Sequence, residues 1–176
     1  MKQIVLTLLV LILISAGSVP GFQGSSEWIK YDSAEGHYTV ELPTQPKLKT
    51  QEAVNASGEK FQQYMASASD PNAVFLVGYF DYAPGTAFSL DKARDGMVQA
   101  VKGTLLSEGS ISLEGSPGRE LKVSATGPDG VEYLVQARFY DMGKRVYVLQ
   151  FIIAKAYDSA STAKAARYFE SFKVTP

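Results

Sequence analysis

Few side chains in this sequence could do chemistry. His37 is the only histidine, and there is no cysteine. A Ser–His–Asp triad would have to use His37, which lies at a turn-to-strand junction, and no nucleophile-elbow motif accompanies it. We therefore expect a solvated turn histidine. The absence of cysteine excludes disulfides, thiol catalysis, Cys-ligated zinc, iron–sulfur clusters and a lipid-modified N-terminal cysteine.

Asp91 and Asp95 are spaced one helical turn apart, and such a pair could serve acid–base chemistry if it were buried. Lys92 and Arg94 lie between them, and the opposite face of the expected helix is apolar. This pattern favours a solvated, mixed-charge helix face. The stretch 127–130 is no phosphate loop, because no Gly-Lys-Ser/Thr follows it. The sequence thus predicts no catalytic residue, no metal site and no cofactor.

Tyrosines are the remaining candidates for a site. They combine apolar area with a hydroxyl, which favours interfaces and ligand pockets, although strands favour them equally. Five of them cluster on the expected central strands and are our candidate binding residues: Tyr79, Tyr82, Tyr133, Tyr140 and Tyr147.

Residues 1–17 have the pattern of a secretory signal peptide: Lys2, an apolar run from Ile4 to Ile14, and then small residues. An uncleaved N-terminal anchor is the alternative, and both predict an exported, periplasmic or extracellular domain. Residues 18–27 are rich in Gly and Ser and predict a flexible linker, followed by a single domain over 28–176. The net charge of −1 gives no indication of a nucleic-acid partner. Contact with a membrane is expected only through an uncleaved N-terminal segment.

The elements that must position these residues centre on 131–154, which predicts two long antiparallel strands joined by a tight turn at 141–144. Gly143 can supply the positive φ that such a turn needs. The second strand is apolar on both faces, so we expect cover on both sides of the sheet. The stretch 73–81 has the same pattern.

Two helices are expected. Apolar residues at helical spacing predict one from Leu90 to about Leu106, with Ser89 as its N-cap. The other should begin with Asp158 or Ser159 as its cap, with an apolar face of Ala163, Ala166, Tyr168, Phe169 and Phe172. Short strands are expected at 37–42, 49–54, 60–68, 111–113 and 121–125, with turns at 55–58 and 116–118. The fold class is α+β, a mainly antiparallel sheet with helices packed on it as an α/β/α sandwich.

Three stretches resemble a known family. They are Tyr38-Thr39-Val40-Glu41-Leu42-Pro43, Gly115-Ser116-Pro117-Gly118-Arg119-Glu120 and Tyr168-Phe169-Glu170-Ser171-Phe172-Lys173. In an exported chain with a tyrosine-bearing hairpin, they are similar to the PsbP-like α/β/α-sandwich proteins, including small bacterial envelope members of unassigned role. The resemblance covers about 28–174 and implies a non-enzymatic accessory or docking domain. It transfers no functional residue.

Three hypotheses of function follow. The first is a non-enzymatic protein-docking module with an envelope protein as partner, which predicts a large exposed apolar patch. The second is a carrier of a small apolar ligand, which predicts a closed, tyrosine-lined pocket between sheet and helix. The third is an enzyme of unfamiliar type, which requires convergent carboxylates in a cleft.

Overall fold

The computed structural model describes residues 27–54, 60–82 and 87–176. The expected signal peptide, nearly all of the expected linker and the turn expected at 55–58 lie outside these residues. In the described part of the chain, no helix is long and apolar enough to cross a membrane.

Two antiparallel sheets and two helices make up the described fold. The small sheet has the order β1-β2-β10, and the large one has the order β3-β4-β5-β9-β8-β7-β6. The strands are β1 (Ile29–Ser33), β2 (Tyr38–Leu42), β3 (Lys47–Val54), β4 (Lys60–Ser69), β5 (Ala73–Asp81), β6 (Thr104–Leu113), β7 (Ser116–Thr126), β8 (Glu132–Asp141), β9 (Arg145–Ala154) and β10 (Lys173–Val174). The helices are α1 (Leu90–Ala100) and α2 (Asp158–Ser171), which the 3₁₀ turn η1 (Lys155–Tyr157) precedes.

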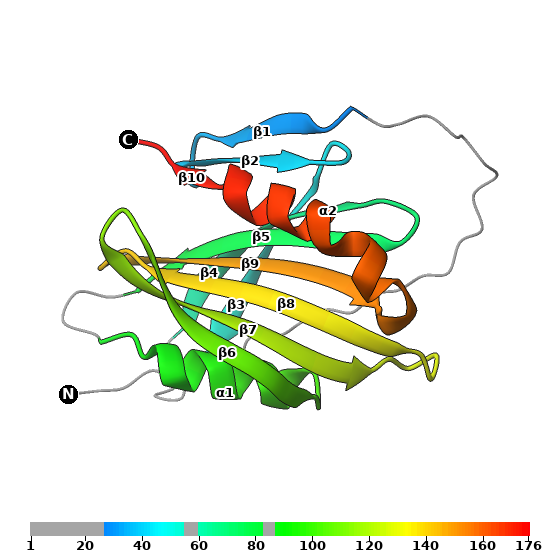
Figure 1. Ribbon diagram of the computed structural model, residues 1–176. Coiled ribbons are helices and arrows are strands. Elements are labelled where there is room, and N and C mark those ends of the chain that lie inside the picture. The colour runs from blue at the N-terminus through cyan, green and yellow to red at the C-terminus, as the bar shows by residue number, and fades with distance from the viewer. Residues whose placement is uncertain (1–26, 55–59, 83–86) are drawn as a thin grey trace.

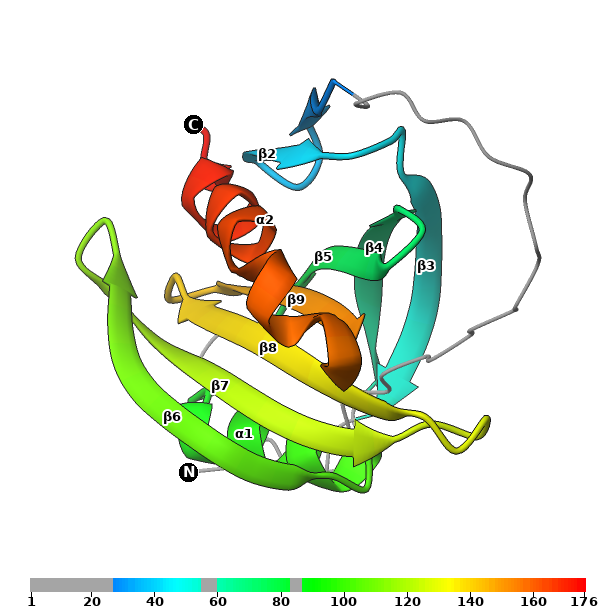
Figure 2. The ribbon, with the colours of Figure 1, turned by 45° about the vertical axis from the view of Figure 1, so that its right-hand side comes forward.

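The layers follow the expected α/β/α order. Figure 2 shows α2 and the small sheet on one face of the large sheet and α1 on the other. The central strand β9 is buried from Val146 to Ile153, as its two apolar faces predicted. Its odd-numbered residues belong to a core with α2 and β2, and most of its even-numbered ones belong to a core with α1. The predicted α+β class and the cover on both faces are therefore confirmed.

The tight turn between β8 and β9 also agrees with the prediction. Gly143 has a φ of 84°, and the backbone N–H of Met142 donates to the carbonyl of Arg145 at 2.9 Å. The Asp141 carboxylate accepts from the N–H of Gly143 at 3.0 Å. Aspartate and glycine thus fix the turn, and the register of the two central strands follows from it.

The first helix is shorter than predicted. It ends at Ala100, and the chain continues as β6 from Thr104. Lys102 adopts a φ of 49°, and a Cβ on Gly103 would lie only 2.6 Å from the carbonyl oxygen of Ser124. The chain therefore turns where its backbone lies against β7. Leu105 continued the helical spacing by coincidence, since it lies on a strand.

The neighbouring turn was also placed wrongly. It falls at Glu114 and Gly115, which have φ of 51° and 81°, and not at 116–118, which begin β7. Pairing of β7 with β8 starts only at Gly118. Pro117 is therefore tolerated, because β7 has a neighbour on only one side there.

The second helix begins near its predicted start, but neither predicted residue caps it. Its N-cap is Tyr157, which makes no side-chain cap bond, and the Asp158 carboxylate instead contacts Lys122 at 2.8 Å. Ala163 and Ala166, placed on the apolar face, are exposed. The buried face is formed by Ser161, Ala165, Tyr168, Phe169 and the following Phe172, at the spacing of one helical stripe.

Candidate binding site

Three of the five candidate tyrosines lie together in the core on the α2 side. Tyr79, Tyr147 and Tyr140 are directly opposite one another across β5, β9 and β8, and all three are buried. Tyr64 of β4 extends the row, with its ring stacked on that of Tyr79 at 4.7 Å. Burial raises the pKa of the Tyr79, Tyr140 and Tyr147 hydroxyls.

The turn between β1 and β2 covers this row of tyrosines. The hydroxyl of Tyr147 donates to the carbonyl of Gly36 at 2.8 Å, and the ring of Tyr38 contacts Tyr147 at 6.0 Å. Beside them, Arg145 lies over the Tyr79 ring at 4.3 Å. Here the tyrosines attach the small sheet to the large one, which is a structural role, and their binding role stays a prediction.

The other two candidates lie apart from this row. Tyr82 and Tyr133 pack into the α1-side core, near opposite ends of β8. Their hydroxyls donate to carboxylates in turns, Tyr82 to Asp141 and Tyr133 to Asp129, each at 2.7 Å. Burial, with the bond to Asp129, raises the pKa of Tyr133 to about 12. The structure therefore does not gather the five residues into one site.

His37 lies in the turn, as predicted. Its φ is 52°, and its Nδ1 is 2.9 Å from the carbonyl oxygen of the C-terminal Pro176, at the exposed end of the small sheet. An exposed imidazole on a left-handed turn residue matches the expected solvated histidine. No group of three or more His, Asp or Glu among the described residues could hold a metal ion.

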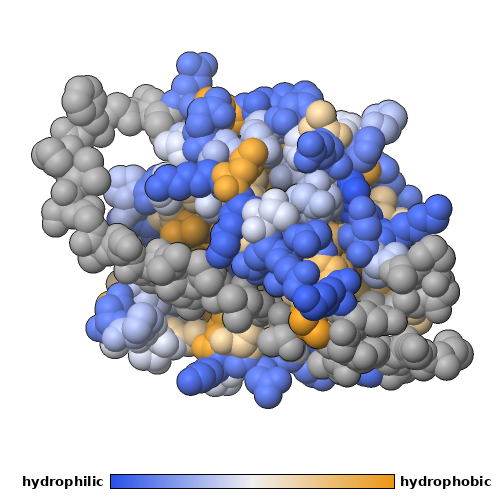
Figure 3. All heavy atoms as spheres, turned by 180° about the vertical axis from the view of Figure 1, so that it is seen from behind, coloured by the Kyte–Doolittle hydropathy of each residue, from blue (hydrophilic) through white to orange (hydrophobic). Residues whose placement is uncertain are grey.

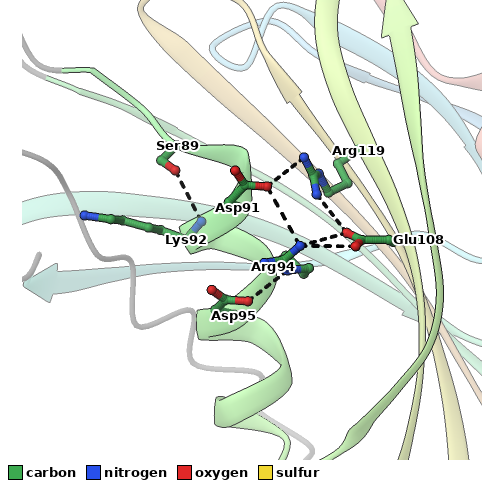
Figure 4. Close-up of polar contacts among 7 residues, drawn as sticks. All are labelled: Ser89, Asp91, Lys92, Arg94, Asp95, Glu108 and Arg119. Carbon is green, nitrogen blue, oxygen red and sulfur yellow. Dashed lines mark hydrogen bonds and ion pairs between the residues drawn. The ribbon is translucent and has the colours of Figure 1, made fainter.

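The paired aspartates of α1 belong to a network of ion pairs with β6 and β7 (Figure 4). Arg94 Nε lies 2.8 Å from Asp95, and Arg119 Nη2 lies 2.8 Å from Asp91. Both arginines reach Glu108 of β6, at 3.1 and 2.7 Å. Their hydrogen bonds hold the pKa of Glu108 below its ordinary value. Ionised carboxylates bound by arginines are poor acid–base groups, so this network joins α1 to the sheet.

The structure contains a groove that the sequence did not predict. It has a volume of about 590 Å³ and lies over β3, β4 and β5, and no residue of α1 lines it. In Figure 1, α1 lies below the β6–β7 end of the large sheet, whereas β3 and β4 form the opposite edge. A single short helix covers only part of a seven-stranded sheet. The groove occupies the part that α1 leaves open.

The floor of the groove continues the α1-side core. It includes Leu76, Phe80 and Val148, which pack in or against that core, and Met65 from β4. Gly78 lies among them, and a Cβ on it would come within 2.8 Å of the Tyr64 carbonyl oxygen. A glycine inside a central strand weakens it and often marks a close backbone approach. Gly78 was therefore one signal in the sequence that could have pointed to this place.

A polar side chain lies in this apolar floor. Gln150 is 6% exposed, and its Oε1 is buried without a hydrogen-bond partner among the described residues. It interrupts an apolar strand, opposite Leu76 of β5 and Ala137 of β8. An unpaired buried amide oxygen costs on the order of 1–3 kcal/mol. Such a cost marks a position that a polar group from outside the chain would stabilise.

These features define a class: an α/β/α sandwich with an open groove on one face and, among the described residues, no cluster of His, Asp or Glu that could hold a metal ion. Comparison with solved structures identifies the fold more closely. The solution structure of cyanobacterial PsbP from Synechocystis sp. PCC 6803 superimposes with a TM-score of 0.60 at 12% identity, covering 90% of this chain and 98% of that one. The protein therefore has the PsbP-like fold, as its three sequence stretches implied.

A second solved structure has the same arrangement. PA94 from Pseudomonas aeruginosa, described as a protein of unknown function and putative regulator, superimposes with a TM-score of 0.53 at 15% identity, covering 85% of this chain and 98% of that one. No family model matches the sequence, and no curated protein does. At these identities the likeness establishes the fold alone.

Proposed function

We propose that this protein is an exported, non-enzymatic accessory module that works by binding, and that the groove over β3, β4 and β5 is its binding surface. The observation that carries the proposal is the groove itself, which has the volume of a ligand site and, in its floor, a buried amide oxygen without a hydrogen-bond partner among the described residues. The carboxylates closest to a catalytic pair are each bound by an arginine. This supports binding over catalysis.

A protein partner in the envelope is one candidate occupant. That role was expected to use a large exposed apolar patch. The strongly exposed large apolar residues of the described chain are instead scattered, and only two of them, on β3, share an element: Leu48 and Val54 on β3, Leu106, Val131 and Tyr157 elsewhere. On the face shown in Figure 3, the visible apolar atoms form small, separate areas among hydrophilic ones. A docking partner would therefore need the groove and the exposed β3 edge beside it.

A small ligand is the second candidate occupant, and the volume of the groove favours it, since ligand pockets measure roughly 300–1,000 Å³. The site differs from the expected one. It is open rather than closed and lies beyond the helix rather than beneath it. Of the five candidate tyrosines, only Tyr79 is among the residues that line it.

A photo-crosslinking experiment in the native host tests the proposal. A benzophenone amino acid replaces Leu76 in the groove, and in a control it replaces Leu106, which is 52% exposed on the distant edge strand β6. We expect an adduct at residue 76 in the envelope fraction and none at residue 106. Equal labelling at both positions, or recovery of the protein from the cytoplasm alone, would contradict the proposal. The intact mass of the exported chain reports whether residues 1–17 are removed.

A further inference from the structure

We propose, building on the proposed function, that the groove binds a single-chain amphiphile with an anionic headgroup, such as a fatty carboxylate or a lysophospholipid. Three features of the groove carry this inference: an apolar floor, two rim lysines without an ion pair among the described residues, and a buried amide oxygen without a hydrogen-bond partner among those residues.

The lysines are Lys47 and Lys49 on the edge strand β3. Both line the groove, opposite Ser67 and Met65 of β4, which lie on the same face of the sheet. Neither makes an ion pair within the described residues, and no Asp or Glu of those residues lines the groove. By contrast, Arg94, Arg119, Arg138, Arg145 and Arg167 all pair with carboxylates. Positive charge without a counter-charge beside an apolar groove fits an anionic headgroup.

The apolar floor supplies the site for the chain. Leu76 and Met65 remain partly exposed, although Leu76 packs against the core beneath α1. Methionine adapts its shape to irregular ligands, and an acyl chain laid over these residues would bury apolar surface that water now covers. The floor has no ionised group among its described residues, so no buried charge there opposes an apolar chain.

The Gln150 amide adds a polar requirement. Its Oε1 accepts no hydrogen bond from the part of the chain that the structure describes, whereas Gln63 Oε1, also in the groove, accepts one from Gln51 at 2.9 Å. Because oxygen and nitrogen of an amide are assigned from such bonds, either end of Gln150 can meet a polar atom after rotation of the group. The carboxylate of a fatty acid, or a hydroxyl or ester group near the head of a lysophospholipid, would satisfy it. A pure hydrocarbon would not.

The test is a titration of the exported chain, labelled with ¹³C-methyl methionine, with laurate below its micelle concentration. Met65 lines the groove, whereas Met97 of α1 is fully buried and serves as an internal control. We expect a saturable shift of the Met65 methyl signal with Met97 unchanged. A lysophosphatidylglycerol of the same chain length distinguishes the two headgroup sources. A neutral monoglyceride of that length should bind at least tenfold more weakly, and acetate should not bind.

Variants complete the test. Lys47→Gln with Lys49→Gln should weaken laurate binding about tenfold, since each exposed ion pair contributes up to about a fivefold change in affinity. The matched control is Lys30→Gln with Lys173→Gln, two exposed lysines of the small sheet, which should leave binding unchanged. Leu76→Trp should block the groove, with folding verified by circular dichroism.

The inference is overturned if the Met65 signal does not move, if Met97 moves equally, or if the neutral analogue binds as tightly as laurate. Crosslinking at residue 76 to a protein, together with no response to laurate, would refute the amphiphile and leave the proposed binding function intact. Absence of any groove adduct would refute both.

Discussion

The hydroxyl of Tyr168 is the most direct test of how α2 is held on the sheet. The side chain is 0% exposed, and its hydroxyl donates to the carbonyl of Leu76 in β5 at 2.5 Å. Burial raises its pKa well above the ordinary value. In Tyr168→Phe the ring keeps its contacts, but a buried carbonyl loses a donor. We expect the free energy of unfolding to fall by about 1–2 kcal/mol, and Tm to fall by about 2–8 °C.

The assay is urea unfolding followed by far-UV circular dichroism, with an unchanged denaturant slope as the check on two-state behaviour. Tyr168→Ala also removes the ring and should cost about 3–5 kcal/mol. Tyr157→Phe is the matched control, because Tyr157 is 48% exposed and should change stability by less than about 0.5 kcal/mol. The reasoning fails if Tyr168→Phe equals the parent chain, or if it costs as much as Tyr168→Ala.

Three further predictions concern α1 and its connection to the sheet. Glu108 is bound by two arginines, and its pKa lies below the ordinary value of 4.5. The stability that the ionised carboxylate contributes to the fold is therefore complete above pH 4.5 and is lost as the pH falls through the lowered pKa. The stability difference between Glu108→Gln and the parent chain in thermal melts should thus shrink from about pH 5 to about pH 3, and a constant difference would contradict it. Gly103→Ala should cost at least about 1–3 kcal/mol in urea unfolding, because its Cβ would meet the Ser124 carbonyl oxygen at 2.6 Å. Gly109→Ala, whose nearest atom is 3.5 Å away, should be nearly neutral, so equal costs would argue against the steric account. Ser89→Ala should lower the unfolding free energy by about 1 kcal/mol, since Ser89 Oγ accepts from the N–H of Lys92 at 3.3 Å, and a melt unchanged from the parent chain would exclude a capping role.

Much of the fold was predictable because local patterns carried it. The β8–β9 hairpin combined a turn glycine with flanking strands rich in β-branched and aromatic residues, and Ala73–Asp81 was apolar on both faces. The errors lie where long-range packing overrides a local pattern. Val101 and Leu105 continued the helical spacing, but the approach of Gly103 to β7 ended the helix before them. The split into two sheets likewise depends on the contact of β2 with α2 and the pairing of β10 with β2.

The candidate site was less predictable than the fold. Lys47 and Lys49 alternate on one face of β3, and Gln150 stands out in an apolar strand, so each was visible in the sequence. Their meeting was not, because β9 is separated from β3 by β4 and β5. The tyrosines differ from these residues, because the sequence analysis did single them out as a possible site. Their composition suggested a pocket. The structure places three of them beneath the β1–β2 turn, Tyr79 also being among the residues that line the groove, and the other two near opposite ends of β8.

The sequence alone determined the α+β class, the pattern of a secretory signal, the buried central hairpin and the exclusion of cysteine chemistry. These follow from composition and from side-chain periodicity, which act over a few neighbouring residues. Tertiary structure alone decided which part of the large sheet stays uncovered and which charged side chains form ion pairs. It also left the Gln150 amide oxygen buried without a hydrogen-bond partner among the described residues. Those outcomes depend on how far α1 extends over the sheet and on strand order, and residues far apart in the chain set both.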